Sequence, residues 1–490
     1  MKYLLKYSPE ISIKSRPVRS RFVKQLKKNL QFLLGAISQN IVVTSHWDYL
    51  EVNSEQDEGS DVPAKLEEIL KDTPGIGSFA RVYAYPFQNL SEVLEYTLRH
   101  YKDRLQGKTF AVRCKRVGKH AFKSVDVEKY VGGGLNQQAS SAGVKLKDPD
   151  IGVRLEIRDQ DVFIIDALSS GMGGFPLGTQ DAVLSLISGG FDSAVSSYLS
   201  IRRGLSTHFC FFNLGGHDHE IAVKEVALYL WMRYGASQRV KFVTVPFEAV
   251  VGEILSKIDN SQMGVVLKRM MLRAAEQVAD ALQIDALVTG EAVAQVSSQT
   301  LANLAVIDEV SHKLVLRPLI MSEKQDIIDL ARKIGTEEFS AVIPEYCGVI
   351  SVKPTTRARL ARIEKEESAF DFDILKSAVM SREVVSIDQI VHQERKQSTA
   401  LRIEEEPGDA MLIDIRHPNE EELKPLKLAG CEILKIPFYK LNTAFSSGQI
   451  DTGKICLLYC DKGIISRLHA SYLLEQGYEN VGVYRPAARI

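Results

Sequence analysis

The 490-residue chain has few cysteines and no long apolar segment, and each scarcity argues against a class of protein. Its six cysteines are spread along the chain, and no two of them form a Cys-x-x-Cys pair. This argues against a disulfide framework, an iron–sulfur cluster and a zinc ribbon. No stretch approaches the roughly 20 apolar residues that span a bilayer, and residues 1–6 contain no signal-peptide apolar region. We therefore expect a cytoplasmic protein without a membrane partner.

Low-complexity tracts are also lacking, and 45% hydrophobic with 25% charged residues is typical of globular proteins. The length predicts about three or four domains. The net charge is only −1, but residues 1–30 carry nine Lys or Arg against one acid, and residues 99–130 carry ten against three. This distribution indicates N-terminal modules that bind a polyanion, with other chemistry further along the chain.

The chain is organised around Ser188-Gly189-Gly190-Phe191-Asp192-Ser193, here called the phosphate loop. An apolar run at 182–187 precedes it and a helical pattern follows, so we predict a strand, a tight loop and a helix. Gly189 and Gly190 allow a sharp turn whose N–H groups face an anion at the helix N-terminus, while Ser188 and Ser193 add hydroxyl donors. Asp192 could hold Mg²⁺ or orient the loop. The pattern resembles the pyrophosphate loop of adenine-nucleotide α-hydrolases, which adenylate a substrate with ATP.

Residues 175–395 are predicted to form this ATP-binding domain, because strand-like runs alternate with helical patterns as in a doubly wound parallel sheet. Further contacts are expected from other strand ends, where Lys268, Gly290 and Gln299 lie close to such positions. The helix that contains Lys268 has the Met and Leu spacing of a core helix. We interpret the run 217–220, His-Asp-His-Glu, as a solvated loop rather than a metal site, and no other metal centre is predicted.

Two modules precede this domain. Residues 1–60 are predicted to be a ferredoxin-like α+β unit with a basic helix at 17–34. Residues 61–168 are similar to the α/β THUMP domain, an RNA-binding module, with strands at 109–113, 153–158 and 162–167. Phosphate contacts are expected from the cations of its basic segment, and Phe122 or His120 could stack on a base. These cations are Arg113, Lys115, Arg116, Lys119 and Lys123.

Residues 405–490 show a new α/β pattern in which a strand ends at Cys460 and a glycine-containing loop and a helix follow. Loop N–H groups at a helix N-terminus lower a thiol pKa and stabilise an anionic sulfur chain. Cys460-x-x-Gly463-x-x-Ser466-Arg467 after Ile413-Asp414-Ile415-Arg416 resembles the rhodanese fold, which carries sulfur as a cysteine persulfide. The remaining cysteines outside 346–348 are expected to be inert core residues, namely Cys114, Cys210, Cys431 and Cys456.

Together with Pro344-Glu345-Tyr346-Cys347-Gly348, these motifs resemble the bacterial tRNA 4-thiouridine synthetases that carry a C-terminal rhodanese domain. The resemblance implies that ATP and Mg²⁺ bind the phosphate loop and that uridine 8 of tRNA is adenylated on O4. A cysteine desulfurase would load Cys460 with a persulfide, and Cys347 would then form a transient disulfide with Cys460.

The resemblance also assigns roles to further residues. Asp192 and Lys324 would be essential to adenylation. It further implies sulfur donation to the sulfur-carrier protein of thiamine thiazole synthesis. The implied nucleotide contacts are Leu186, Ile187, Lys268, Gly290 and Gln299.

Two other classes remain open at this point. An adenylating ligase of the same nucleotide fold could use ammonia instead of sulfur and would need neither Cys347 nor Cys460. A non-enzymatic RNA-binding or sulfur-carrier scaffold would have a decayed loop, which the intact phosphate loop argues against. The route by which Cys460 reaches the base is also open, because a domain movement and a homodimer are both compatible with the sequence.

Overall fold

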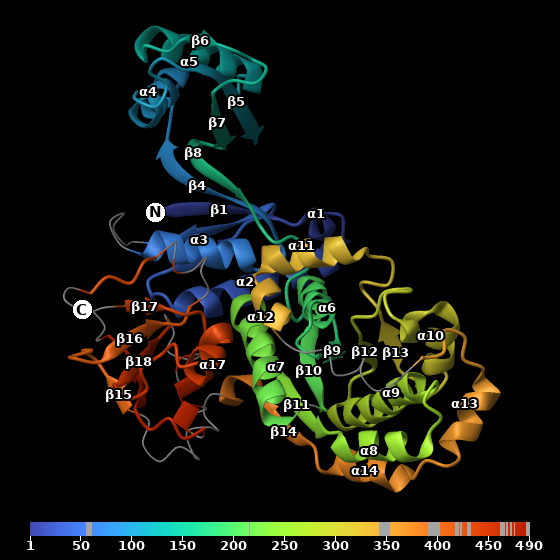
Figure 1. Cartoon of the computed structure of the whole chain (residues 1–490). Helices are drawn as coiled ribbons and strands as arrows, with labels where there is room; N and C mark the ends of the chain where they lie inside the picture. Colours follow the sequence, from blue (N-terminus) through green and yellow to red (C-terminus); the bar gives the residue numbers. More distant parts are fainter. Residues whose placement is uncertain are drawn as a thin grey trace. The chain divides into compact units, whose positions relative to one another are not determined.

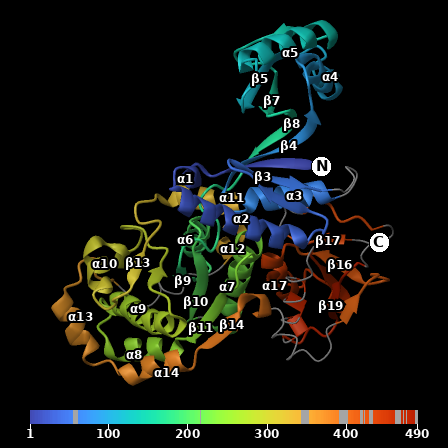
Figure 2. The ribbon, with the colours of Figure 1, turned by 180° about the vertical axis from the view of Figure 1, so that it is seen from behind.

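The computed structural model describes residues 1–54, 61–214, 216–342, 353–390, 402–416, 421, 424–428, 433–460, 466, 469–470, 473–474 and 476–486. Two compact units make up the chain. The first comprises Met1–Asp181 and Ile201–Leu205, and the second comprises Ala182–Ser200 and Ser206–Ile490. Figure 1 and Figure 2 show the ribbon from opposite sides.

The first unit contains an eight-stranded sheet with the order β2-β3-β1-β4-β8-β7-β5-β6. Its strands are β1 (Lys2–Tyr7), β2 (Val42–Ser45), β3 (Tyr49–Asn53), β4 (Ile76–Pro86), β5 (Thr109–Val117), β6 (Gly143–Val144), β7 (Ile151–Arg158) and β8 (Asp161–Ser170). Strand β4 pairs with β1 on one side and with β8 on the other, so the sheet is continuous between the ferredoxin-like half and the second half.

Five helices accompany the described part of this sheet, and they are α1 (Pro9–Ser12), α2 (Arg16–Gly35), α3 (Val62–Asp72), α4 (Leu90–Tyr101) and α5 (Ser124–Gln138). Helix α2 shows why the basic sequence at 16–35 folds as it does. Phe22, Leu26, Leu30 and Leu34 are buried and recur every fourth residue, so they form one apolar face. Of the cations between them, Lys24 and Lys28 are exposed and Lys27 is half-buried.

A buried cluster of charges joins the two halves of the first sheet. Lys6 Nζ in β1 lies 2.7 Å from Glu156 Oε1 in β7. Arg158 contacts Glu156 and also donates two hydrogen bonds, of 2.8 and 2.7 Å, to the Asp48 carboxylate. Buried charges are tolerated when they are paired in this way. The cluster therefore fixes β7 with respect to β1 and the residue before β3.

The second unit contains a six-stranded sheet with the order β13-β12-β9-β10-β11-β14. Its strands are β9 (Ala182–Leu186), β10 (Ser206–Asn213), β11 (Lys241–Pro246), β12 (Ala286–Val288), β13 (Leu314–Leu316) and β14 (Glu383–Ser386). The helices are α6 (Phe191–Arg202), α7 (Gly216–Leu230), α8 (Glu248–Lys257), α9 (Met263–Leu282), α10 (Leu301–Asp308), α11 (Lys324–Ile334), α12 (Glu337–Val342), α13 (Leu360–Glu367) and α14 (Phe372–Met380). A π-helical turn, Trp231–Gly235, continues α7.

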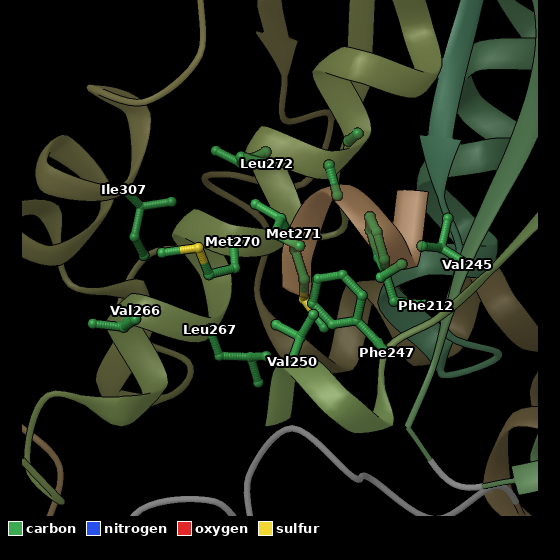
Figure 3. Packing of buried hydrophobic residues seen from close by; sticks show 14 of the residues in the cluster. Phe212, Val245, Phe247, Val250, Val266, Leu267, Met270, Met271, Leu272 and Ile307 are labelled. Atoms are coloured by element: carbon green, nitrogen blue, oxygen red, sulfur yellow. The ribbon is translucent and has the colours of Figure 1, made fainter. Parts of the chain in front are cut away.

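Helix α9 is the centre of the core that supports this sheet (Figure 3). Leu267, Met270 and Met271 are buried in one cluster with Phe247, which precedes α8, and Ile307 in α10. Lys268 lies among these apolar positions but is half-buried, as expected for a residue at the polar edge of a core helix. The prediction of a core helix here is confirmed.

The same unit contains a third, five-stranded sheet with the order β15-β19-β18-β16-β17. Its strands are β15 (Arg402–Glu404), β16 (Met411–Asp414), β17 (Ile433–Lys435), β18 (Cys456–Tyr459) and β19 (Val481–Tyr484), and helix α17 (Phe438–Ser446) follows β17. All four of its ladders are parallel. Cys460 follows β18 directly, at the carboxyl end of a central strand.

The structure confirms the α/β class and differs from the sequence-based predictions in two respects. The strand at 383–386 pairs antiparallel with β11, so the six-stranded sheet is parallel except at this edge. Residues 216–220 begin helix α7 instead of forming a solvated loop, and His219 is buried.

In the described part of the chain no helix is long and apolar enough to cross a membrane.

Candidate active site

The phosphate loop connects β9 to α6, as predicted. Gly189 has a φ of +82°, a left-handed conformation that glycine adopts without strain. The backbone N–H of Ser188 donates to Ser193 Oγ at 3.1 Å, and Ser193 Oγ donates to the Gly190 carbonyl at 3.0 Å. The Ser193 hydroxyl therefore holds the phosphate loop at the N-terminus of α6, the positive end of the helix, where an anion is stabilised.

Asp192 and Lys324 meet at this loop although 132 residues separate them in sequence. Lys324 Nζ lies 2.9 Å from Asp192 Oδ1 and 3.1 Å from Oδ2. Asp192 is in the first turn of α6, and Lys324 is the first residue of α11. Two residues that the family resemblance implicates in adenylation thus form one ion pair beside the loop.

The segment after β12 packs directly on the start of α6. A Cβ on Gly290 would lie 2.6 Å from the carbonyl carbon of Asp192, so this close approach requires glycine. Gln299 is buried, and its Oε1 accepts a hydrogen bond of 3.3 Å from the N–H of Ala292. Gln299 therefore holds the backbone at Ala292, in the same segment whose Gly290 packs against Asp192.

Lys268 is anchored to this segment through the buried carboxylate of Glu291. Lys268 Nζ lies 3.7 Å from Glu291 Oε1, and Arg317 Nε lies 2.9 Å from Oε2. Thr289 Oγ1 also donates to Oε2, at 3.0 Å. Burial alone would raise the pKa of Glu291, but Lys268, Arg317 and Thr289 outweigh it and lower the pKa. The carboxylate is therefore charged and holds both cations at the ends of β12 and β13.

His219 and Ser340 support the phosphate loop from behind. His219 Nε2 lies 3.3 Å from the carbonyl oxygen of Ser188, and Ser340 Oγ donates to the carbonyl oxygen of Gly189 at 2.8 Å. Burial lowers the pKa of His219, although the Ser188 carbonyl opposes this shift, so the ring is neutral. Among the described residues no group of His, Cys, Asp and Glu could hold a metal ion by itself.

Leu186 and Ile187, the nucleotide contacts implied by the resemblance, lie at the junction of β9 and the phosphate loop. Ile187 is buried, and its backbone N–H donates to the Cys210 carbonyl at 2.9 Å. Leu186 is half-buried at the last position of β9. Their position at the edge of the loop follows from the strand that precedes it.

Cys460 has two polar contacts with Ser466, which is helical. The backbone N–H of Ser466 lies 3.3 Å from Cys460 Sγ, and Ser466 Oγ lies 3.4 Å from it. The neighbouring strand β16 ends at Asp414, which forms a buried ion pair of 2.5 Å with Arg416. One N–H donor therefore reaches this sulfur, whereas the predicted ring of N–H groups from the loop stays a prediction. Residues 461–465 and Cys347 lie outside the described residues.

Of the remaining described cysteines, Cys210 and Cys456 are buried as predicted, whereas Cys114 is half-buried. Burial raises the pKa of Cys456 to about 11 and that of Cys210 to about 12. Burial together with Glu128 also raises the pKa of Cys114 to about 12. These thiols are protonated at neutral pH and therefore poor nucleophiles. Cys431 lies outside the described residues.

The predicted RNA-binding cations line the end of β5 and the turn after it. Arg113, Lys115, Lys119 and Lys123 are exposed, while Arg116 is half-buried. Arg113 and Lys115 share one face of the strand because side chains alternate along it. Two Arg113 nitrogens donate to backbone carbonyls, Nη2 to that of Leu146 at 2.7 Å and Nη1 to that of Val112 at 3.1 Å, while the residue as a whole is exposed.

Neither predicted stacking residue is a free platform. Phe122 is packed against the core of its module, and the His120 ring bonds Arg116 at 2.9 Å and the Asp159 carbonyl at 2.6 Å. An exposed aromatic ring lies instead in the first module, where Trp47 is 66% exposed. The guanidinium groups of Arg16 and Arg19 lie 5.6 and 5.0 Å from its centre.

Curated relatives match the chain along its length. A protein of Saccharophagus degradans named tRNA sulfurtransferase is 52% identical over 99% of this chain and 100% of its own. One of Azotobacter vinelandii with the same name is 54% identical, also over 99% and 100%. The chain belongs to the tRNA sulfurtransferase family.

Family models match three regions of this sulfurtransferase-family chain. They are described as "ThiI ferredoxin-like domain" for residues 2–80, "THUMP domain" for 87–165 and "Thiamine biosynthesis protein (ThiI)" for 178–372. The first two models meet near the end of β4, whereas the sequence analysis placed the boundary near residue 60.

Two solved structures share the fold of this chain. A 4-thiouridine synthetase in complex with RNA and bound ATP is 26% identical, with a TM-score of 0.69 over 79% of this chain and 99% of its own. The protein PH1313 from Pyrococcus horikoshii, which is 18% identical with a TM-score of 0.53, shares the fold over 68% of this chain and all of its own.

Sequence reasoning found the residues that this family member brings together at the phosphate loop, but it missed several of their supports. Glu291, Gln295 and Ser340 contact the predicted site residues Lys268, Asp192 and Gly189, respectively, and carry no motif of their own. Arg317 acts one step further away, through Glu291, and His219 contacts the Ser188 carbonyl although its run was interpreted as a solvated loop. The signal that was available was position, since Glu291 and Arg317 follow strands whose carboxyl ends face the ligand in this type of sheet.

Proposed function

We propose that this chain transfers sulfur to uridine 8 of tRNA in an ATP-dependent reaction that produces 4-thiouridine. The observation that carries the proposal is the Asp192–Lys324 ion pair beside an intact phosphate loop. It is supported by the names of the relatives and by the bound ATP and RNA named for the solved structure.

Adenylation is proposed as the first step. The N–H groups of the phosphate loop and the hydroxyls of Ser188 and Ser193 would hold the phosphates, and Lys324 would balance their charge. O4 of uridine attacks the α-phosphorus, the bond to the β-phosphate oxygen breaks, and pyrophosphate leaves. Leu186, Ile187, Lys268, Gly290 and Gln299 would surround the nucleoside.

A carboxylate oxygen is the type of ligand that Mg²⁺ prefers, so Asp192 would be the residue that holds an ion arriving with the phosphates. When bound, Mg²⁺ supplies positive charge against the phosphate oxygens. The remaining ligands would come from ATP and water.

Sulfur transfer is proposed as the second step. A cysteine desulfurase loads Cys460 with a persulfide, and the contacts from Ser466 stabilise its anionic form. The terminal sulfur attacks C4 of the adenylated uridine and AMP leaves. Cys347 then attacks Cys460 Sγ, which releases the sulfur on the base and leaves a Cys347–Cys460 disulfide for a two-electron reductant. The C-terminal sheet would act as a rhodanese-like sulfur carrier.

The exposed cations of β5 are proposed to bind the tRNA backbone, and Trp47 with Arg16 and Arg19 provides a stacking surface suited to an unpaired base.

The persulfide on Cys460 would also supply the sulfur-carrier protein of thiazole synthesis, in agreement with the description of the matching family model. We place the reaction in the cytoplasm, where tRNA and cysteine desulfurase are available, and a homodimer is one arrangement that would bring Cys460 to the base.

The proposal is tested by incubating unmodified tRNA with the chain, ATP, Mg²⁺, cysteine and a cysteine desulfurase, and by measuring 4-thiouridine in the digested tRNA. We expect thiolation that requires both ATP and the desulfurase. Persulfide formation on Cys460 without any thiolated tRNA would contradict the assignment to tRNA and indicate another sulfur acceptor.

A further inference from the structure

Asp192 is held by two groups, and the second comes from a residue to which the proposed reaction assigns no role. Gln295 Nε2 donates a hydrogen bond of 2.7 Å to Asp192 Oδ2. Lys324 Nζ contacts both carboxylate oxygens, at 2.9 and 3.1 Å. The two side chains reach Asp192 from different elements, Gln295 from the segment after β12 and Lys324 from α11.

The backbone before Gln295 is bent into a turn that is unfavourable for its residues. The N–H of Gln295 bonds the carbonyl of Ala292 at 3.4 Å, which closes a four-residue turn. Ala294, its third residue, has a φ of +62°, in the left-handed region where a Cβ is strained. Strained residues persist where the surroundings hold them, and they cluster at functional sites.

Three further contacts hold this turn in place. The N–H of Val293 donates to the Ile320 carbonyl at 3.0 Å, and the N–H of Ala294 donates to the Gln299 carbonyl at 2.9 Å. Gly290 brings the start of the segment onto Asp192 itself, where no larger residue fits. The segment is therefore fixed at both ends, and its geometry directs the Gln295 amide to Oδ2 of the Asp192 carboxylate.

We propose that Gln295 is a positioning residue for adenylation, which keeps the Asp192 carboxylate in place when Lys324 turns to the phosphates of ATP. Lys324 has an exposed side chain, 41% accessible, and can be drawn to a stronger anion. Without Gln295, Asp192 would then lose both of the side chains that contact it, and its carboxylate would no longer be fixed toward the ion that arrives with the phosphates. The amide suits this task because it donates a hydrogen bond and carries no charge that would compete with Lys324.

The inference rests on the proposed function, and the experiment separates the two. The tRNA-dependent release of pyrophosphate and the dissociation constant of ATP are measured for the wild type, Gln295→Met, Gln295→Glu and Gln325→Met. Gln325 is the matched control because its amide also donates to a carboxylate, Asp329 Oδ1 at 3.0 Å, but on the exposed face of α11. Thermal midpoints are recorded for all four proteins.

For Gln295→Met we expect kcat to fall roughly 10- to 100-fold, the range typical of a misplaced catalytic group. For Gln295→Glu the fall should be larger, because two carboxylates would repel each other and compete for Lys324. ATP affinity and thermal midpoints should stay near the wild-type values, and Gln325→Met should behave like the wild type.

A kcat for Gln295→Met equal to that of Gln325→Met would overturn the inference and leave the proposed function standing. Equal losses in kcat and ATP affinity would also overturn it, because they would make Gln295 a ligand-binding residue. A lowered thermal midpoint in both Gln295 variants, with wild-type kcat at a temperature where both are folded, would reduce Gln295 to a structural role. If the wild type releases no pyrophosphate with tRNA and ATP, the proposed function fails and the inference falls with it.

Discussion

The hydroxyl of Ser340 in α12 donates a hydrogen bond of 2.8 Å to the carbonyl oxygen of Gly189 in the phosphate loop. Both residues are buried, and 151 positions separate them in sequence. A loop that binds an anion through its N–H groups must keep its carbonyl oxygens turned away. The bond to Ser340 holds one of them in that orientation.

Ser340→Ala should therefore weaken ATP binding and lower stability by about 1 to 3 kcal/mol, because the Gly189 carbonyl would lose its buried donor. Calorimetric titration with ATP and thermal unfolding measure the two effects. Ser256→Ala is the control, since its hydroxyl donates to the Glu253 carbonyl at 3.0 Å on an exposed part of α8. Unchanged ATP affinity in Ser340→Ala would show that the bond does not shape the loop.

Gly290→Ala should reduce adenylation strongly, because the added Cβ would lie 2.6 Å from the backbone of Asp192 and displace one of the two segments. We expect a fall in pyrophosphate release of roughly 100-fold, as for misplacements of about 1 Å. Gly252→Ala in α8 is the matched change, since no atom lies within 4 Å of its Cβ position. That variant should keep its activity and gain up to about 1 kcal/mol of stability. Full activity in Gly290→Ala would contradict the proposed contact.

Arg113→Glu together with Lys115→Glu should weaken tRNA binding and make it less dependent on salt. Each lost phosphate contact is expected to reduce the slope of log affinity against log salt by about 1. Filter binding at several salt concentrations gives this slope. Lys376→Glu, on the exposed face of α14, should leave both quantities unchanged. An unchanged slope in the double variant would place the RNA on another surface.

Acid should destabilise the second unit through half-buried His208 and buried His219. Burial and the nearby Lys241 lower the pKa of His208 to about 4, and burial also lowers that of His219. The unfolded chain therefore binds more protons than the folded chain between about pH 6.5 and pH 4, so stability falls as pH falls through this window.

For His208 the slope reaches at most about 1.4 kcal/mol per pH unit. Urea unfolding followed by Trp231 fluorescence should show a flatter pH dependence in His208→Gln than in the wild type. His312→Gln, at an exposed position of the same unit, should keep the wild-type dependence. If stability fell with pH equally steeply in His208→Gln and in the wild type, the acid destabilisation could not be assigned to His208.

Much of this architecture could be predicted from the sequence because its strands and helices have strong periodic patterns. The helix predicted at 17–34 is α2, and the strands predicted at 153–158 and 162–167 lie within β7 and β8. The phosphate loop lies between a strand and a helix as expected. Lys324 was placed in the site by family resemblance, and the structure brings it to Asp192.

The parts that could not be predicted depend on contacts between distant segments. Strand β13 has three residues, too few for a periodic signal, and yet it positions Arg317 beside Glu291. His219 lies in a polar run that suggests a loop. In the structure this run belongs to helix α7, and the His219 ring packs against Phe211. The turn at Ala294 lacks the glycine that normally marks such a conformation.

In the proposed reaction, adenylation and sulfur donation use separate residues of one chain. This separation is tested most directly by measuring pyrophosphate release and 4-thiouridine formation in the same reactions, for the wild type, Cys460→Ala, Cys456→Ala and Lys324→Met. We predict that Cys460→Ala still releases pyrophosphate with tRNA but forms no 4-thiouridine, that Lys324→Met loses both, and that Cys456→Ala retains both. Thiolation by Cys460→Ala at the wild-type rate would contradict the role of Cys460 as the sulfur donor.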